Sequence, residues 1–104
     1  MSNPPDADLT NVMPEVVRNA EQGRYEIHID GRLAGQVDYH DRGTVRVMPH
    51  TEVDPAHQGQ GLAGALVQAA LDDVRSEGMT VEPSCPYVET WIRRHPEYAD
   101  LVED

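Results

Sequence analysis

The sequence has no lysine, no phenylalanine and a single cysteine. All of its positive charge comes from arginine: 8 basic residues stand against 19 acidic ones, for a formal net charge of −11. Because such a surface repels phosphate backbones, nucleic acid and anionic membranes are poor partners. It would attract cationic substrates, although keeping the protein soluble is the more general explanation. Without lysine, a Walker-type phosphate loop is excluded.

Long apolar runs and a targeting signal are also missing. No run approaches the roughly 20 residues of a membrane span, and the opening MSNPPDADLT lacks the basic and apolar regions of a signal peptide. One cysteine excludes an internal disulfide and is typical of a reducing compartment. We therefore expect a cytoplasmic protein with no membrane partner. Residues 1–14, polar and proline-containing, should form a flexible tail, and residues 15–104 one compact domain.

What is present after the tail is an alternation of apolar and polar residues. It runs from Tyr25 to Ile29 and resumes from Leu33 to Tyr39, with apolar side chains on one face. Asp30-Gly31 between these runs predicts a two-residue hairpin turn. Asp41-Arg42-Gly43 predicts the next turn, followed by a strand over residues 44–53.

Pro49 and the segments that follow complete the predicted architecture. Pro49 cannot donate to a strand ladder, so it predicts an edge or a bulge. The apolar period then becomes helical from Leu62 to Val74, with Gly78 just past the helix end. A strand over residues 79–83 and a helix over residues 86–95 follow.

Strand, helix and strand in this order require a parallel pair joined by a crossover. The sequence therefore predicts an α/β (α+β) fold: an antiparallel β-meander, a β-α-β unit and a short C-terminal helix. The acidic end EYADLVED is most simply a solvated tail, with Tyr98 and Leu101 packing back.

The segment DPAHQGQGLAGALVQAAL, residues 54–71, opens the long helix with glycines instead of a capping side chain. No carboxylate follows until Asp72, so the N–H groups of the first turn and the positive end of the helix have no obvious protein partner. Such an end suits a phosphate, and a glycine-capped end that binds only water fits equally well.

Two known phosphate loops match these glycines. Gly59-x-Gly61-x-x-Gly64, with Glu82 downstream, fits the dinucleotide-binding fingerprint. We reject it, because residues 54–58 separate the glycines from the strand and only 22 residues follow Glu82. Gln58-x-x-Gly61-x-Ala63 instead matches the Q/R-x-x-G-x-G/A loop of the GNAT superfamily of acyl-CoA-dependent N-acetyltransferases.

The match extends from about residue 24 to residue 102. It resembles the small single-domain acetyltransferases of that superfamily in its strand, loop, helix and PSCPY…HPEY tail. The resemblance implies that acetyl-CoA is the co-substrate, that no metal takes part, and that an amine is acetylated. The long helical segment that follows the first strand in larger members is absent, so the acceptor cannot be carried over.

The resemblance also implies where acetyl-CoA binds. The pyrophosphate would sit on the loop amides, with Gln58 where many members have arginine. The pantetheine arm would lie along the end of the preceding strand, where the parallel strands splay apart. The implied binding residues are Thr51, Val53, Gln58, Gly59, Gln60, Gly61, Leu62 and Ala63.

Four residues are candidates for the chemistry. His50 and Glu52 share one strand face if Pro49 leaves the alternation intact. Either could take a proton from the amine, histidine being the better base near neutral pH, or be an ordinary strand residue. Cys85, at the expected start of the last helix, could accept the acetyl group, protonate the CoA thiolate, or be a small buried hydrophobe. Tyr87 is the other candidate acid, or a core aromatic beside Trp91.

The spacing of His28, His40 and His57 does not form a metal site. Three questions remain open after the sequence analysis. The acceptor and the oligomeric state are not indicated. A non-catalytic CoA-binding or protein-interaction module on the same fold is the alternative to an enzyme.

Overall fold

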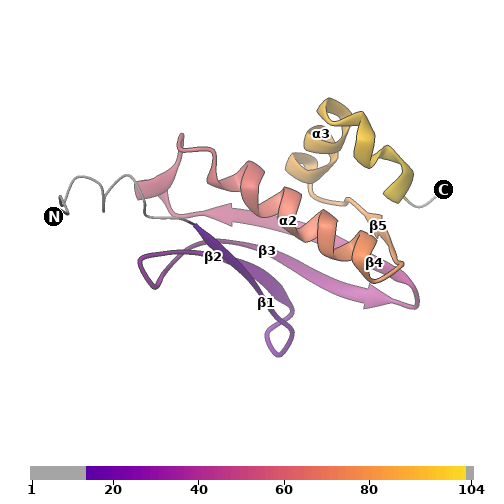
Figure 1. Cartoon of the computed structure of the whole chain (residues 1–104), viewed down its shortest axis with the longest axis horizontal. Coiled ribbons are helices and arrows are strands. Elements are labelled where there is room, and N and C mark those ends of the chain that lie inside the picture. Colours follow the sequence, from indigo (N-terminus) through magenta and orange to yellow (C-terminus); the bar gives the residue numbers. More distant parts are fainter. Residues whose placement is uncertain (1–13, 103–104) are drawn as a thin grey trace, which may run out of the picture.

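The computed structural model describes residues 14–102, which form one mixed sheet with helices packed against it (Figure 1). The five strands lie in chain order, β1-β2-β3-β4-β5; β4 and β5 are parallel and the others antiparallel. The predicted α+β fold is confirmed. The elements are β1 (Glu15–Asn19), β2 (Arg24–Ile29), β3 (Arg32–Arg42), β4 (Val45–Val53), the 3-10 helix η1 (Pro55–His57), α2 (Leu62–Ser76), β5 (Thr80–Glu82), α3 (Pro86–Arg94) and the 3-10 helix η2 (Pro96–Leu101).

The predicted hairpin turn between β2 and β3 is confirmed. Asp30 and Gly31 have φ values of 52° and 78°, the positive values that a type I′ turn requires. The next turn is one step later than predicted. Arg42 still pairs with Val45, so β3 continues through it and the chain reverses at residues 43–44.

β1 was not predicted as a strand. Its sequence EVVRN places two valines side by side and so lacks the alternation of a half-buried strand. It pairs with β2 over its whole length, and residues 20–23 alone connect the two strands. The long helical segment of larger GNAT members is therefore absent between β1 and β2.

The bulge predicted at Pro49 is present in β4. Asp38 pairs with His50 and His40 pairs with Val47, so β4 has one extra residue at this point. Before the bulge, even-numbered residues of β4 face α2. Arg46 donates a hydrogen bond to Glu77 at the end of α2, and Met48 packs in the core. After the bulge, odd-numbered residues of β4 face α2. The contacts of Thr51 and Val53, described below, show this.

A second bulge, in β3, was not foreseen. Ile27 pairs with Gly35 and His28 with Leu33, which leaves Ala34 as the extra residue. Leu33 is therefore turned to the face opposite the core, where it is 41% exposed. The prediction that Leu33 shares the apolar face of this strand is wrong for that reason.

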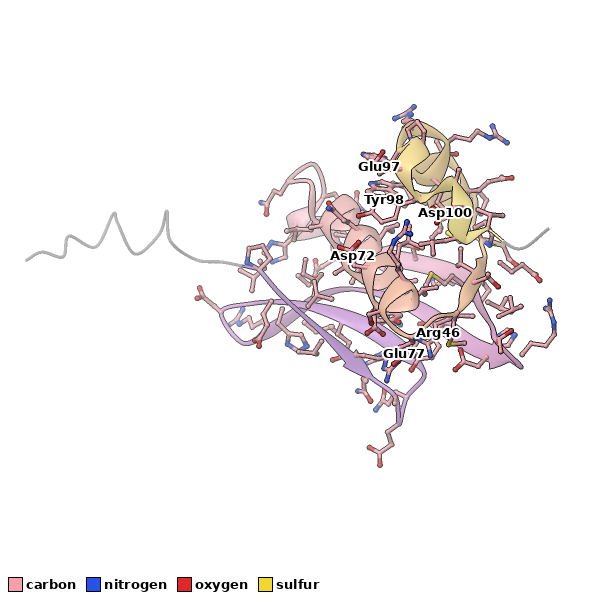
Figure 2. All side chains as sticks on the ribbon, turned by 45° about the vertical axis from the view of Figure 1, so that its right-hand side comes forward. Arg46, Asp72, Glu77, Glu97, Tyr98 and Asp100 are labelled. Atoms are coloured by element: carbon pink, nitrogen blue, oxygen red, sulfur yellow. The ribbon has the colours of Figure 1, made fainter. Side chains whose placement is uncertain are left out.

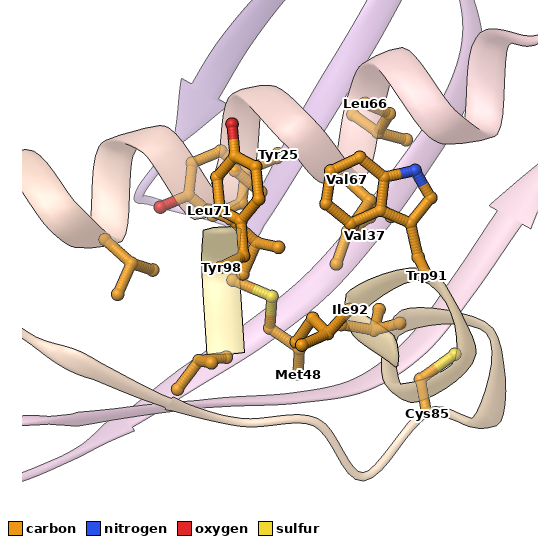
Figure 3. Close-up of a cluster of buried hydrophobic side chains, with 14 of the residues drawn as sticks. Tyr25, Val37, Met48, Leu66, Val67, Leu71, Cys85, Trp91, Ile92 and Tyr98 are labelled. Carbon is orange, nitrogen blue, oxygen red and sulfur yellow. The ribbon is translucent and has the colours of Figure 1, made fainter. Parts of the chain in front are cut away.

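α2 lies across the sheet and supplies much of the core (Figure 1, Figure 3). Gly78, with φ 68°, follows the end of the helix as predicted. The buried side chains of α2 are Leu62, Leu66, Val67, Ala70, Leu71 and Val74.

The C-terminal segment is not a solvated tail over residues 97–102. Tyr98 and Leu101 pack back as expected, at 8% and 5% exposure. The Tyr98 hydroxyl donates to Asp72 at 2.7 Å, and Arg75 donates to both carboxylate oxygens of Asp100, so η2 is held against α2 (Figure 2). These contacts, which sequence periodicity could not reveal, also cover the side of the core next to α3.

Arg46 is the centre of a buried polar cluster that also lies at the C-terminal end of α2 (Figure 2). It is 3% exposed, and it donates to Asp41 at 2.7 and 3.0 Å, to Glu77 at 3.1 Å and to the Tyr25 hydroxyl at 2.8 Å. The hydrogen bonds to Asp41 raise the pKa of Arg46 and lower the pKa of Asp41. Both groups therefore stay ionised, and the cluster fixes the β3–β4 hairpin to the end of α2.

Candidate functional site

The site begins where β4 and β5 separate. They pair only from Val45 to Val47 on the β4 side, and one further bond joins the Cys85 amide to the Met48 carbonyl at 2.9 Å. The chain then turns into α3. Residues 49–53 of β4 thus have no β5 partner, which is the splayed opening that the resemblance implied.

The loop between β4 and α2 is built from local turns. The Asp54 carboxylate accepts the Ala56 amide at 2.8 Å and so starts η1. Gly59 and Gly61 have φ values of 84° and 78°, and open space surrounds the position of a side chain at each. Gly61 is the N-cap of α2 and provides no side-chain cap.

The amides of residues 59–64 have no acceptor in the described part of the chain. The first turn of α2 contains no acidic residue. These N–H groups therefore add to the positive end of the helix dipole without any protein group to neutralise them. An oxyanion placed at this end would complete their hydrogen bonding.

These amides border a hollow of about 280 Å³ on the α2 side of β4. Most residues that the resemblance implied in acetyl-CoA binding line it; Thr51 and Gln60 do not. His57 and Tyr87 line it as well, and His57 was considered from the sequence only as a possible metal ligand. The lining residues are Val53, His57, Gln58, Gly59, Gly61, Leu62, Ala63 and Tyr87.

Two side chains shape the edge of this hollow. Gln58 Nε2 donates to the Val53 carbonyl at 3.3 Å, tying the loop to the end of β4. Tyr87 extends from the first turn of α3 and is 42% exposed, with no hydrogen-bond partner in the described part of the chain. Its alternative interpretation, a core aromatic packed with Trp91, is therefore wrong.

Cys85 is the N-cap of α3 and is 6% exposed. Its Sγ lies 3.4 Å from the Thr51 hydroxyl, so the two side chains meet across the opening between β4 and α3. Figure 3 shows the thiol at the margin of the core cluster, to which Trp91 and Ile92 also belong. The side chain of Thr51 therefore contacts Cys85, one of the catalytic candidates.

His50 and Glu52 also lie together, but on the other face of β4. Their Nε2 and Oε1 atoms are 3.5 Å apart, and their side chains are 57% and 70% exposed. Because residues alternate along a strand, they point away from the face where Thr51 meets Cys85. The four catalytic candidates therefore lie two on each side of the strand: His50 and Glu52 on the face away from α2, Cys85 and Tyr87 on the α2 side.

A second hollow, of about 270 Å³, lies on the His50–Glu52 side at the ends of β3 and β4. It contains two carboxylates and no basic residue. Leu33, which the β3 bulge turns outward, is one of the residues that line it, and the sequence pattern did not predict this position. Its lining residues are Leu33, Ala34, Gly35, Gln36, Glu52, Asp54 and Pro55.

Residues 14–102 contain neither a candidate metal site nor a candidate membrane span. No group of three or more His, Cys, Asp or Glu side chains lies close enough together to hold a metal ion. None of the helices in this range has the length and apolar character needed to cross a membrane.

The arrangement of a splayed parallel pair beside an uncapped helix defines a GNAT-fold domain. The NMR structure of a GCN5-like protein from Staphylococcus aureus matches with a TM-score of 0.67 and 18% identity, covering 86% of this chain and 87% of that one. A GNAT family acetyltransferase from Brucella melitensis, solved in complex with acetyl-CoA, matches with a TM-score of 0.55 and 21% identity, covering 73% and 54%. At these identities the likeness shows the fold alone.

The sequence itself belongs to the GCN5-related N-acetyltransferase family, whose model matches residues 24–101. Protein NATD1 of Gallus gallus is 37% identical over 49 residues, which are 47% of this chain and 44% of that protein. Protein NATD1 of Danio rerio is 31% identical over 92 residues, covering 84% and 83%. The match to the avian relative thus spans less than half the length of either chain, whereas the match to the fish relative spans most of both.

Proposed function

We propose that this protein is an acyltransferase that moves an acetyl group from acetyl-CoA to an amine. The observation that carries the proposal is the row of unpartnered amides over residues 59–64, bordering a hollow at the positive end of α2. Glycines at positions 59 and 61 leave the space that a phosphate needs to approach these amides. Gln58 would bind beside the pyrophosphate, in the position where many family members have arginine.

The splayed end of β4 supports a path for the pantetheine arm. Thr51 and Val53 lie on the segment of β4 that has no β5 partner, between the loop and Cys85. The arm would run along this segment, so that the thioester ends in the opening between β4 and α3. Cys85 and Met48, both buried, would exclude water from that end.

The two pairs of candidate residues suit the two proton transfers of the reaction. Acetyl-CoA supplies an activated acyl group; the protein must deprotonate the amine and protonate the departing thiolate. His50 and Glu52, on the open face, would receive the proton of an amine approaching from that side. Cys85 and Tyr87, on the α2 face, are the candidates for protonating the thiolate. Cys85 could instead accept the acetyl group on Sγ and pass it to the amine.

The second hollow is our proposed site for the acceptor. It is next to Glu52, on the same face as the proposed bases, and its charged groups are the carboxylates of Glu52 and Asp54. A cationic amine, such as one with a second ammonium group, would be attracted to it. We propose no nucleic-acid partner, since the net charge of −11 repels a phosphate backbone.

A non-catalytic CoA-binding or protein-interaction module is the second candidate. It is favoured by the short β1–β2 connection, which leaves out the segment that walls the acceptor site in larger members. Both candidates require CoA binding, and only the enzyme releases free CoA thiol when acceptor amines are added.

Calorimetric titration with acetyl-CoA tests the cofactor site, using the wild type, Gly61→Val and Gly78→Val. Both glycines have positive φ, at opposite ends of α2, so both variants strain the backbone and only the first affects the loop. We expect micromolar binding by the wild type and by Gly78→Val, weakened about tenfold or more in Gly61→Val. Absence of wild-type binding at millimolar ligand, or equal affinity of all three proteins, would contradict the proposal.

A further inference from the structure

The cofactor hollow has one residue that can become a cation near neutral pH. Its lining includes neither arginine nor lysine, and the chain contains no lysine at all. Of the lining side chains only His57 and Tyr87 ionise, and a tyrosine ionises to an anion well above neutral pH. Histidine is the side chain that gains a positive charge between about pH 8 and 5.

The local geometry leaves one nitrogen of His57 available. His57 ends η1, and its Nδ1 lies 3.4 Å from Gln60 Oε1, an atom that can only accept. This long hydrogen bond accounts for a proton on Nδ1. Nε2 has no partner in the described part of the chain, so a second proton can bind there and be donated to a ligand.

The charges around His57 are few on every element that borders the hollow. Asp54 belongs to the same turn, and its carboxylate accepts the Ala56 amide. Glu52, on β4, lines the second hollow, which lies on the opposite face of the strand. α2 has no acid in its first turn, and α3 contributes Tyr87. Protonation of His57 therefore changes a hollow that has only backbone dipoles into one with a full positive charge.

We propose that His57 is the phosphate-pairing cation of this site, and that CoA binding is coupled to its protonation. The proposal rests on the proposed function, since it needs CoA phosphates in this hollow. A ligand with several negative charges must approach a protein of net charge −11, which makes a local cation valuable. By linkage, a ligand that favours protonated His57 takes up a proton and binds more tightly as pH falls.

The test is calorimetric titration at pH 5.5, 6.5 and 8.0, with dephospho-CoA as the probe. Dephospho-CoA lacks the 3′-phosphate monoester, whose second ionisation falls in this range, and keeps the pyrophosphate. Repeating each titration in two buffers of different ionisation enthalpy measures the protons taken up. The variants are His57→Gln and, as the matched control, His40→Gln, which removes an exposed histidine from β3.

We expect the wild type and His40→Gln to bind about tenfold more tightly at pH 5.5 than at pH 8.0, equivalent to about 1.4 kcal/mol. His57→Gln should bind with nearly constant affinity and no proton uptake, close to the wild-type affinity at pH 8.0. Equal pH dependence in His57→Gln and the wild type would overturn the inference while leaving the proposed function intact. Absence of binding by the wild type at every pH would overturn both.

Discussion

The residue whose contacts bear most directly on the chemistry is Cys85. Its amide bonds to β4 through the Met48 carbonyl, and its thiol meets the Thr51 hydroxyl at 3.4 Å. The backbone bond does not depend on the side chain. Substitutions of the thiol can therefore test a chemical role without removing the attachment of α3 to β4.

We predict that Cys85→Ala lowers kcat by about 10²-fold or more, while the affinity for acetyl-CoA changes less than about threefold. The reason is that the side chain would act on the thioester, whereas the loop amides would hold the phosphates. Thiol release in an acceptor screen gives kcat, and calorimetry gives the affinity. Thr51→Val, which removes the hydroxyl and keeps the volume, is the comparison that reports on positioning of the thiol. Wild-type turnover in Cys85→Ala would assign the cysteine to packing alone.

Most of the residues proposed to bind the cofactor line one hollow, and the sequence could group them because they are close together in the chain. Gly59 and Gly61 have positive φ values, which glycine adopts readily, so the turn of this loop is encoded locally. The prediction that Cys85 lies at the start of a helix was likewise based on neighbouring residues in the sequence. The contact of Cys85 with Thr51, and the face that Tyr87 occupies, depend on how α3 meets β4. The periodicity of apolar residues along the sequence does not predict that contact.

At the scale of the elements, α2 is fixed to the sheet by the buried cluster around Arg46. Three carboxylates surround one guanidinium, and their side chains are 33–40% exposed, against 4% for the arginine. Removing the arginine would leave the acids able to recover water, which limits the loss. The cluster also ties together three segments that are distant in the chain: the β3–β4 hairpin, Tyr25 of β2 and the end of α2.

We predict that Arg46→Met lowers the free energy of unfolding by about 3 kcal/mol, the low end for a broken buried ion pair. Arg46→Lys should lose less, because the charge remains while the forked hydrogen bonds do not. Urea unfolding measures both. The exposed pair Arg93–Glu89, at 3.5 Å, provides the control: Arg93→Met should change stability by less than about 0.5 kcal/mol. A fully stable Arg46→Met would show that the cluster serves orientation and adds no stability.

Elements defined by one period, such as α2, were predicted almost to the residue. The errors occur where pairing between strands decides the outcome. The register of β3 against β2 produces the bulge at Ala34, and pairing with β2 makes a strand of EVVRN. The ordered η2 segment depends on Tyr98 reaching Asp72 across the fold. The first two depend on how neighbouring strands pair, and the third joins residues 26 positions apart, so a pattern within one segment predicts none of them.

At the scale of the whole molecule, charge and shape act together. The chain has a net charge of −11, and the proposed acceptor hollow concentrates part of it in two carboxylates. Long-range attraction would bring cationic amines to the surface, and the hollow would select those that fit. The two contributions respond differently to single substitutions, because any lost carboxylate weakens the first and only a lining carboxylate weakens the second.

We predict that Glu52→Gln raises KM for a diamine acceptor by about threefold to tenfold, whereas Glu21→Gln, which removes the same charge from the β1–β2 turn, changes it less than twofold. Raising the salt concentration should raise KM for the diamine in the wild type. Initial rates with a diamine and a neutral monoamine of equal length give the comparison. A fall in kcat with both acceptors would identify Glu52 as the base; unchanged kinetics with both would remove it from the site.

At Pro49 the strand contains one extra residue. The alternation between the two faces passes over this residue, so the residues after it have the faces that they would have without it. A strand of the same length that ran straight would turn His50 and Glu52 under α2 and place Thr51 and Val53 outside. A strand that lacked Pro49 altogether would leave all four where they are. Relatives with a regular strand should therefore align to this one with a gap opposite Pro49. An alignment without that gap would exchange the residues of the proposed cofactor face with those of the proposed acceptor face.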